Sequence, residues 1–186
     1  MRIIAGSHKG RALAAPRGRN TRPTADRTRE SIFNKLAHAS WSDGIADKRV
    51  LDLFAGSGAL GFEAMSRGAA FCLFVETDAG ARGAIRDNVE ALQLWATTRL
   101  HRRDATAMGP KPANLGAPFD LVFLDPPYGK GLGELALSRL RDGGWLNPGA
   151  IAVLEVGNEE APETPGWERL DEGEYGAARV VYLKRG

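Results

Sequence analysis

An alternation of apolar runs with amphipathic stretches, which starts at residue 49, constrains the fold of this chain more than any other feature. Short apolar runs predict buried strands at 50–54, 71–76, 99–104, 119–124 and 150–156. Between them, the sequence predicts helices at 59–67, 78–94 and 132–141. Strands that alternate with helices form a parallel, doubly wound sheet. The sequence therefore predicts an α/β fold.

The last part of the chain departs from this alternation. Residues 167–171 and 177–183 both have the character of strands, and residues 172–176 join them without a helix. We therefore expect an antiparallel hairpin at this end, rather than another strand–helix–strand unit.

The size of the chain fits one domain with at most an appendage. A chain of 186 residues buries roughly two-thirds of the surface that it exposes when unfolded. The single Cys72 cannot form an internal disulfide. The apolar runs are too short to span a bilayer, and an apolar signal core is absent after Met1. We expect a cytoplasmic protein that does not contact a membrane.

The charge of the chain is distributed unevenly. Residues 1–35 contain nine basic and two acidic residues, a net +7, so the remainder carries a net −5. A basic N-terminal segment on an acidic body favours a polyanionic partner, although a solvated tail accounts equally well for a charge run alone. We expect residues 1–23 to form a basic arm, in which 2–6 and 10–13 can pair as a small hairpin. Residues 24–186 would then form the main domain.

A helix at about 24–39 is expected to lead this main domain. Arg27 and Arg29 fall in its first turn, where the helix dipole disfavours cations. A neighbouring acid or a bound phosphate is therefore expected to hold these two guanidinium groups.

A glycine-rich loop follows the first predicted strand. Gly56, Gly58 and Gly61 form a G-x-G-x-x-G pattern, and Glu76 follows Gly56 by 20 residues. This pattern and the acid are typical of dinucleotide sites. Three glycines alone are also compatible with a tight turn that binds nothing.

The acidic residues around this loop distinguish between two cofactors. Asp52, Glu76, Asp104 and Asp125 all fall at the ends of predicted strands, and the carboxyl ends of parallel strands line one crevice. Carboxylates repel a dinucleotide's pyrophosphate, but each attracts the ammonium or the sulfonium of S-adenosylmethionine by about 1–4 kcal/mol at close range. The acids therefore favour S-adenosylmethionine.

The sequence Asp125-Pro126-Pro127-Tyr128 follows the strongest predicted strand. Two successive prolines fix the backbone dihedral φ near −65° and make a rigid corner. Such a corner suits a planar ligand that carries an amino group. The Tyr128 ring would stack on the plane, while the Asp125 carboxylate and the Pro126 carbonyl would accept the two N–H bonds. A proline-containing surface loop is the simpler alternative.

These motifs resemble those of known methyltransferases. Residues 125–128 resemble the (D/N/S)-P-P-(Y/F/W) motif of amino methyltransferases, and residues 51–58 resemble their first cofactor-binding motif. Residues 2–6 and 22–30 narrow the resemblance to the RsmD family, bacterial enzymes that methylate the N2 atom of a guanine in 16S ribosomal RNA. Many of its members carry Phe in place of Tyr128.

The resemblance implies a Rossmann-like class I methyltransferase fold with a seven-stranded sheet, and S-adenosylmethionine as cofactor without a metal. Asp52 would lie by the cofactor's ammonium group, Glu76 would accept from its ribose hydroxyls, and Asp104 would accept from its adenine amino group. The remaining expected cofactor contacts are Phe54, Ala55, Gly56, Ser57 and Gly58 in the loop, and Thr77 and Ala105 beside the adenine ring.

The resemblance also implies a partner and its contacts. Asp125, Pro126 and Tyr128 would hold the target base, and the RNA phosphates would contact Arg17, Arg19, Arg22, Arg27 and Arg29. The partner would be 16S rRNA within a 30S particle or an assembly intermediate, bound by a monomer.

Three alternatives remain open from the residues. The same chemistry could act on a DNA base, another RNA or a protein glutamine. The glycine loop could serve an NAD-binding oxidoreductase, or the chain could bind RNA without catalysis.

Overall fold

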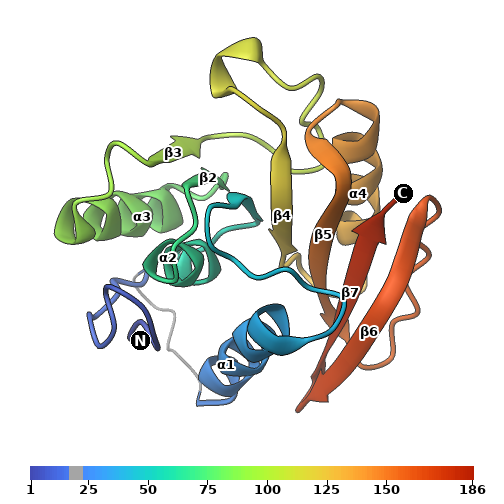
Figure 1. Cartoon of the computed structure of the whole chain (residues 1–186), viewed down its shortest axis with the longest axis horizontal. Coiled ribbons are helices and arrows are strands. Elements are labelled where there is room, and N and C mark those ends of the chain that lie inside the picture. The colour runs from blue at the N-terminus through green and yellow to red at the C-terminus, as the bar shows by residue number, and fades with distance from the viewer. Residues whose placement is uncertain (17–22) are drawn as a thin grey trace.

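The computed structural model describes residues 1–16 and 23–186. Within these ranges, seven strands form one sheet with the order β3-β2-β1-β4-β5-β7-β6 (Figure 1). The strands are β1 (Arg49–Leu53), β2 (Phe71–Val75), β3 (Thr98–His101), β4 (Phe119–Leu124), β5 (Leu146–Gly157), β6 (Trp167–Tyr175) and β7 (Ala178–Arg185). Strands β1 to β5 are parallel to one another, and β7 pairs antiparallel with both β5 and β6. The predicted α/β sheet and its C-terminal antiparallel hairpin are confirmed.

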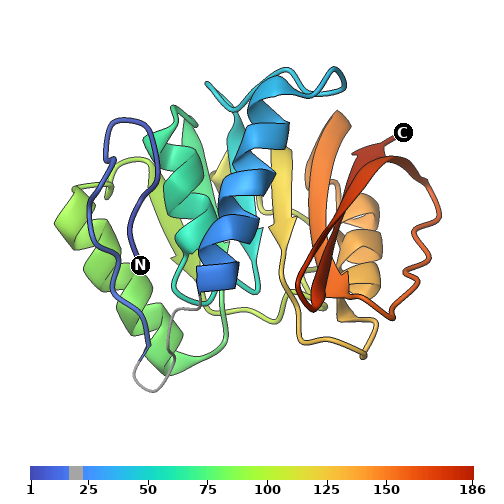
Figure 2. The same ribbon diagram turned by 90° about the horizontal axis from the view of Figure 1, so that it is seen from below.

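The helices cover both faces of this sheet. They are α1 (Pro23–His38), α2 (Ala59–Ser66), α3 (Ala79–Leu92) and α4 (Leu132–Asp142), and a short 3-10 turn, η1, spans Ala113–Leu115. Helices α1, α2 and α3 lie on one face and α4 lies on the other (Figure 2). Successive strand residues point to opposite faces. Val50 accordingly packs with α1, α2 and α3, whereas Leu51 packs with α4.

The observed strands differ from the expected ones mainly at their ends. Strand β3 ends at His101 instead of extending to Asp104, and β5 begins at Leu146, before the apolar run. The hairpin strands extend to Tyr175 and begin again at Ala178, so the connection is shorter than expected. Leu146 of β5 pairs with Phe119 of β4, and residues 172–175 of β6 pair with β7, and pairing across a sheet is not visible in local sequence.

The described N-terminal residues pack against the body of the protein. Arg2 and Ala12 form an antiparallel bridge, and the amides of Ile3, Gly10 and Leu13 donate across the same turn to the carbonyls of Arg11 (3.0 Å), Ile3 (2.8 Å) and Met1 (2.8 Å), so the expected small hairpin is present. Ile3 and Leu13 are buried in the same core cluster as α1 and α2. The buried Glu63 of α2 accepts hydrogen bonds from the backbone amides of Ile4 (2.8 Å) and Ala5 (3.1 Å). The segment is therefore anchored by apolar contacts and a buried carboxylate.

The expected RNA contact of Arg29 does not fit the structure. Its side chain is buried, donates to the Arg2 carbonyl (2.7 Å) and lies 3.5 Å from Asp26 and 3.7 Å from Glu63. The helix begins at Pro23, so Arg29 lies in its second turn rather than in the expected first turn. Neighbouring acids hold the guanidinium group, which was one of the two expected explanations. Because the guanidinium faces inward, Arg29 is not available to an RNA phosphate. Arg27 is exposed, and Arg17, Arg19 and Arg22 lie outside the described residues.

Candidate active site

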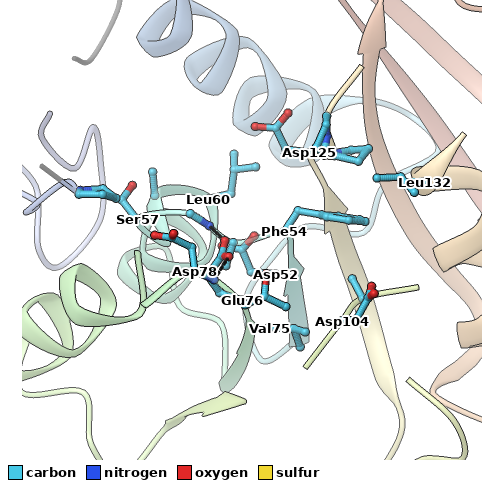
Figure 3. A pocket seen from close by; sticks show the side chains of 18 of the residues that line it. Asp52, Phe54, Ser57, Leu60, Val75, Glu76, Asp78, Asp104, Asp125 and Leu132 are labelled. Carbon is cyan, nitrogen blue, oxygen red and sulfur yellow. Dashed lines mark hydrogen bonds between the residues drawn. The ribbon is translucent and has the colours of Figure 1, made fainter. Parts of the chain in front are cut away.

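A cleft of about 1010 Å³ opens where the parallel strands end. Strands β1 and β4 are neighbours in the sheet, but their following connections lead to opposite sides, which is where α/β folds bind their ligands. Figure 3 shows Ser57 at one end of the cleft and Leu132 at the other, with Asp52 and Glu76 between them. The predicted residues that line this cleft are Asp52, Phe54, Ala55, Gly56, Ser57, Glu76, Thr77, Asp104, Ala105, Asp125, Pro126 and Tyr128.

Asp52 provides a buried carboxyl group near the end of β1. Its Oδ2 atom accepts a hydrogen bond from the Gly61 amide at 3.0 Å. Burial raises the pKa of Asp52 to about 8, and the nearby charge of Glu76 adds to this effect. A cation bound in the cleft would favour the ionised form. Binding of a cationic ligand should therefore release a proton from Asp52.

The second glycine of the loop has a packing role. Gly58 does not line the cleft, although it was expected to approach the cofactor. It has a positive φ of 81°, and a Cβ atom there would lie 2.7 Å from the Phe62 ring and 2.9 Å from the Phe74 ring. Glycine at this position lets α2 begin close against the sheet. Gly58 therefore supports the loop by close packing, and its expected contact with the cofactor stays a prediction.

Glu76 fixes the shape of the glycine loop. Its Oε1 atom accepts from the Gly56 amide and its Oε2 atom accepts from the Asp78 amide, both at 2.8 Å. Each carboxylate oxygen can accept more than one hydrogen bond. Glu76 can therefore hold the loop and accept from ligand hydroxyls at the same time.

Asp104 also lines the cleft, three residues beyond the end of β3. Its Oδ1 atom accepts from both the amide (2.8 Å) and the hydroxyl (2.7 Å) of Thr106. These hydrogen bonds lower the pKa of Asp104. The carboxylate is therefore ionised at neutral pH, and the turn with Thr106 sets its direction.

The proline corner lies directly beyond β4. Asp125 borders the cleft, and loss of hydration raises the pKa of its carboxyl group, with a further increase from the charge of Glu155. Tyr128 is 46% exposed, and its hydroxyl donates to Glu155 Oε1 at 2.9 Å. Loss of hydration and the Glu155 charge also raise the pKa of Tyr128. The structure thus places an acceptor and an exposed ring beside the glycine loop.

Part of the cleft wall comes from the N-terminal segment. Met1, Ala15 and Pro16 line the cleft. A long-range contact brings the segment there. The side chain of Asn88 accepts from the Ala14 amide (2.7 Å), donates to the Ala14 carbonyl (3.1 Å) and donates to the Ser57 carbonyl (3.2 Å).

Two residues near the site left a signal that the sequence reasoning missed. Asn88 shares a helix face with Ile85 and Leu92, and an amide on an apolar helix face is expected to have specific partners. Glu155 interrupts the apolar run of the fifth predicted strand. A charged residue in such a run points either to an edge or to a site.

In residues 1–16 and 23–186, no three His, Cys, Asp or Glu side chains are grouped so that they could hold a metal ion. Among the helices of these same residues, none is both long and apolar enough to cross a membrane.

Comparison with known proteins agrees with the motifs. The family described as "Conserved hypothetical protein 95" matches residues 1–184. The Escherichia coli (strain K12) protein "Ribosomal RNA small subunit methyltransferase D" is 38% identical over 155 residues, which are 83% of this chain and 74% of that protein. This chain belongs to the RsmD family. The resemblance predicted from the motifs is confirmed.

Other RsmD-family comparisons cover the whole length. "Putative rRNA methyltransferase YlbH" of Bacillus subtilis is 40% identical over 189 residues, 100% of both chains. A solved structure titled "Putative methyltransferase yhhF from Escherichia coli" is 36% identical, with a TM-score of 0.85, and the match covers 100% of this chain and 97% of that one. The methyltransferase fold predicted for this chain is therefore also confirmed.

Proposed function

We propose that this RsmD-family protein transfers a methyl group from S-adenosylmethionine to the exocyclic N2 atom of a guanine in 16S ribosomal RNA. One observation carries the proposal: a single cleft contains both the acid-lined glycine loop and the proline corner. The names of the relatives, which include small-subunit rRNA methyltransferases, support it.

The acids of the cleft fit this cofactor better than a dinucleotide. Asp52 would lie by the ammonium group, Glu76 would accept from the ribose hydroxyls and Asp104 would accept from the adenine amino group. Thr77 and Ala105 would flank the adenine ring. When bound, S-adenosylmethionine supplies a methyl group on a positively charged sulfur, which is a good leaving group. A pyrophosphate placed among the same carboxylates would be repelled.

The proline corner would hold and activate the target amine. An aromatic amine is a poor nucleophile, because its lone pair is delocalised into the ring. The Asp125 carboxylate and the Pro126 carbonyl would accept its two N–H bonds and direct the lone pair outward. As positive charge develops on the nitrogen, Asp125 would stabilise it. Most of the rate enhancement would then come from positioning.

The target base must leave its helix or loop to reach this corner. Unstacking a base costs a few kcal/mol, which stacking on Tyr128 would offset in part. Phosphate contacts would supply the rest, and we propose that they come from the exposed Arg27 and, on charge alone, from Arg17, Arg19 and Arg22. The N-terminal residues 1–23 would then be an RNA-binding arm on the domain formed by 24–186, in a cytoplasmic monomer that acts on 30S particles.

A methyl-transfer assay with tritiated S-adenosylmethionine tests the proposal. The protein would be incubated with naked 16S RNA, with 30S particles and with DNA, and the products would be digested to nucleosides. We expect labelled N2-methylguanosine from at least one of the two RNA substrates, naked 16S RNA and 30S particles. Label in a methylated DNA base, or in another RNA nucleoside, would contradict the proposed target.

A further inference from the structure

One acid beside the proline corner has no role in the proposed reaction. Glu155 lies in β5, which is parallel to β4, and Leu124 of β4 pairs with Leu154 of β5. The next residues, Asp125 just after β4 and Glu155 within β5, therefore lie beside each other at the same edge of the sheet. Glu155 is also paired with Val180 of β7, so its backbone is held on both sides.

The Glu155 side chain reaches two members of the corner. Its Oε1 atom accepts the hydroxyl hydrogen of Tyr128 at 2.9 Å. The strand register places its carboxyl group beside that of Asp125, and the charge of Glu155 adds to the loss of hydration in raising the pKa of Asp125.

The position of the Tyr128 ring depends on the same end of β5. A Cβ atom at Gly157 would lie 3.5 Å from the ring, so the ring packs on the Gly157 backbone. Glu160 accepts from the amides of Gly129 (2.9 Å) and Gly157 (2.5 Å) and so ties the corner to this strand end. Gly157 thus supports one side of the ring, Glu155 fixes its hydroxyl, and the exposed part remains free to stack.

We infer that Glu155 is a positioning residue for methyl transfer, which sets the Tyr128 ring for stacking and forms with Asp125 a carboxyl pair that takes the released proton. The inference rests on the proposed function. In the transfer, the nitrogen lone pair forms the N–C bond as the S–C bond breaks, and its electrons go to sulfur. The N–H bond then gives its electrons back to nitrogen, and its proton passes to Asp125, where Glu155 shares it.

The groups that face this pair make its charge state sensitive to Glu155. The charges of Glu155 and of Asp52 in β1 both oppose ionisation of Asp125. The Tyr128 hydroxyl donates to Glu155 and stabilises its carboxylate, and Glu160, from the segment after β5, acts on Tyr128. Loss of the Glu155 charge in Glu155→Gln should therefore let Asp125 ionise at lower pH.

A carbon-13 NMR titration of the aspartate carboxyl groups tests the pair without relying on activity. The Asp125 signal is assigned as the one that Asp125→Asn removes. We expect the Asp125 pKa to fall by about one pH unit in Glu155→Gln. The Asp125 pKa should stay unchanged in Glu159→Gln, which removes an exposed charge from the segment just after β5. An Asp125 titration that is the same in the wild type and in Glu155→Gln would overturn the inference.

Methylation kinetics then test the positioning of the ring. Glu155→Ala should raise KM for RNA roughly fivefold, which is the effect of losing one hydrogen bond. Tyr128→Phe should show a similar increase, and the double variant should show no more than either alone. Glu155→Gln retains an acceptor for the hydroxyl, so its KM should be that of the wild type. The pH at which its kcat falls on the acidic side should be lower than in the wild type, because Asp125 ionises at lower pH. A normal KM in Glu155→Ala contradicts the positioning role.

The two experiments separate the failure of the inference from that of the proposed function. If the wild-type protein methylates no RNA, the proposed function fails and the role of Glu155 in transfer fails with it. The NMR titration would still establish whether Asp125 and Glu155 form a pair. If methylation occurs but the Asp125 titration is the same in the wild type and in Glu155→Gln, only the inference fails.

Discussion

Individual carboxylates in the cleft have different tasks because their surroundings differ. Asp52 is buried and binds its proton tightly, whereas Asp104 is exposed and is held ionised by Thr106. Glu76 spends part of its hydrogen-bonding capacity on the glycine loop. Acids that are equivalent in the sequence are therefore not equivalent in the site.

Asp125 should be essential for turnover. Asp125→Ala removes an acceptor for the target amine and the charge that stabilises the developing cation, so kcat should fall by roughly 10²–10³. The affinity for S-adenosylmethionine should change little, as measured by calorimetry. Asp125→Asn is the matched control, because it retains one acceptor of the same shape. Near-normal turnover of the alanine variant would refute the role of Asp125.

Asp52 should make the ligand-free protein less stable at alkaline pH. Its pKa rises from its ordinary value to about 8 on folding, so its contribution to stability is full below pH of about 4 and is lost as the pH rises through the folded pKa. Thermal unfolding across this range should show a loss of roughly 2–5 kcal/mol. Asp52→Asn should lose much less over the same interval. If the two proteins showed parallel curves, Asp52 would not be the buried acid responsible.

At the scale of elements, local pattern predicts what is local. Strands β1, β2 and β4 and helix α4 lie within one or two residues of the expected bounds, because apolar runs and glycine stops mark them. The partners of the N-terminal segment could not be predicted. Ile3 and Leu13 lie in short apolar stretches between basic residues, and their partners lie far along the chain.

The same distinction applies to the site. The strand ends and the two motifs place Asp52, Glu76 and Asp125 around one cleft, which topology alone predicts. The loop-supporting role of Gly58 and the burial of Arg29 depend on tertiary packing against Phe62 and Glu63. The motifs named both residues but could not reveal these packing contacts.

Asn88 should connect the N-terminal segment to cofactor binding. Asn88→Ala removes hydrogen bonds to Ala14 and Ser57, so the affinity for S-adenosylmethionine should fall roughly three- to tenfold. Calorimetry measures this effect, and the exposed Asn34→Ala in α1 provides a control for a helical asparagine. A lower melting temperature with unchanged affinity would assign Asn88 to stability alone.

At the scale of the whole molecule, the charge asymmetry separates the grip on RNA from the chemistry. Residues 1–35 carry a net +7 and the rest of the chain a net −5, so the body alone should repel RNA. Each phosphate contact contributes close to one unit to the slope of log affinity against log salt. RNA capture should therefore depend strongly on salt, while cofactor binding should not.

Replacing Arg17, Arg19 and Arg22 together by Gln should flatten this salt dependence. The slope of RNA affinity should fall by about one unit for each lost phosphate contact, and S-adenosylmethionine affinity should be unchanged. The control is a triple Gln variant at the exposed body cations Arg139, Arg169 and Lys184, which has the same change in net charge. Equal slopes in the two triple variants would show that the basic arm does not bind RNA and is a solvated tail.

The order of strands at the C-terminal end has a consequence for synthesis of the chain. Strand β7 lies between β5 and β6, so a strand that leaves the ribosome after β6 takes an internal place in the sheet. Until residues 178–185 emerge, β7 is missing, and the apolar edge of β5 with which it pairs stays open. An open apolar edge is a template for pairing with another chain. Chains that terminate early, near residue 177, should therefore be prone to aggregation even though the whole cleft has already been made.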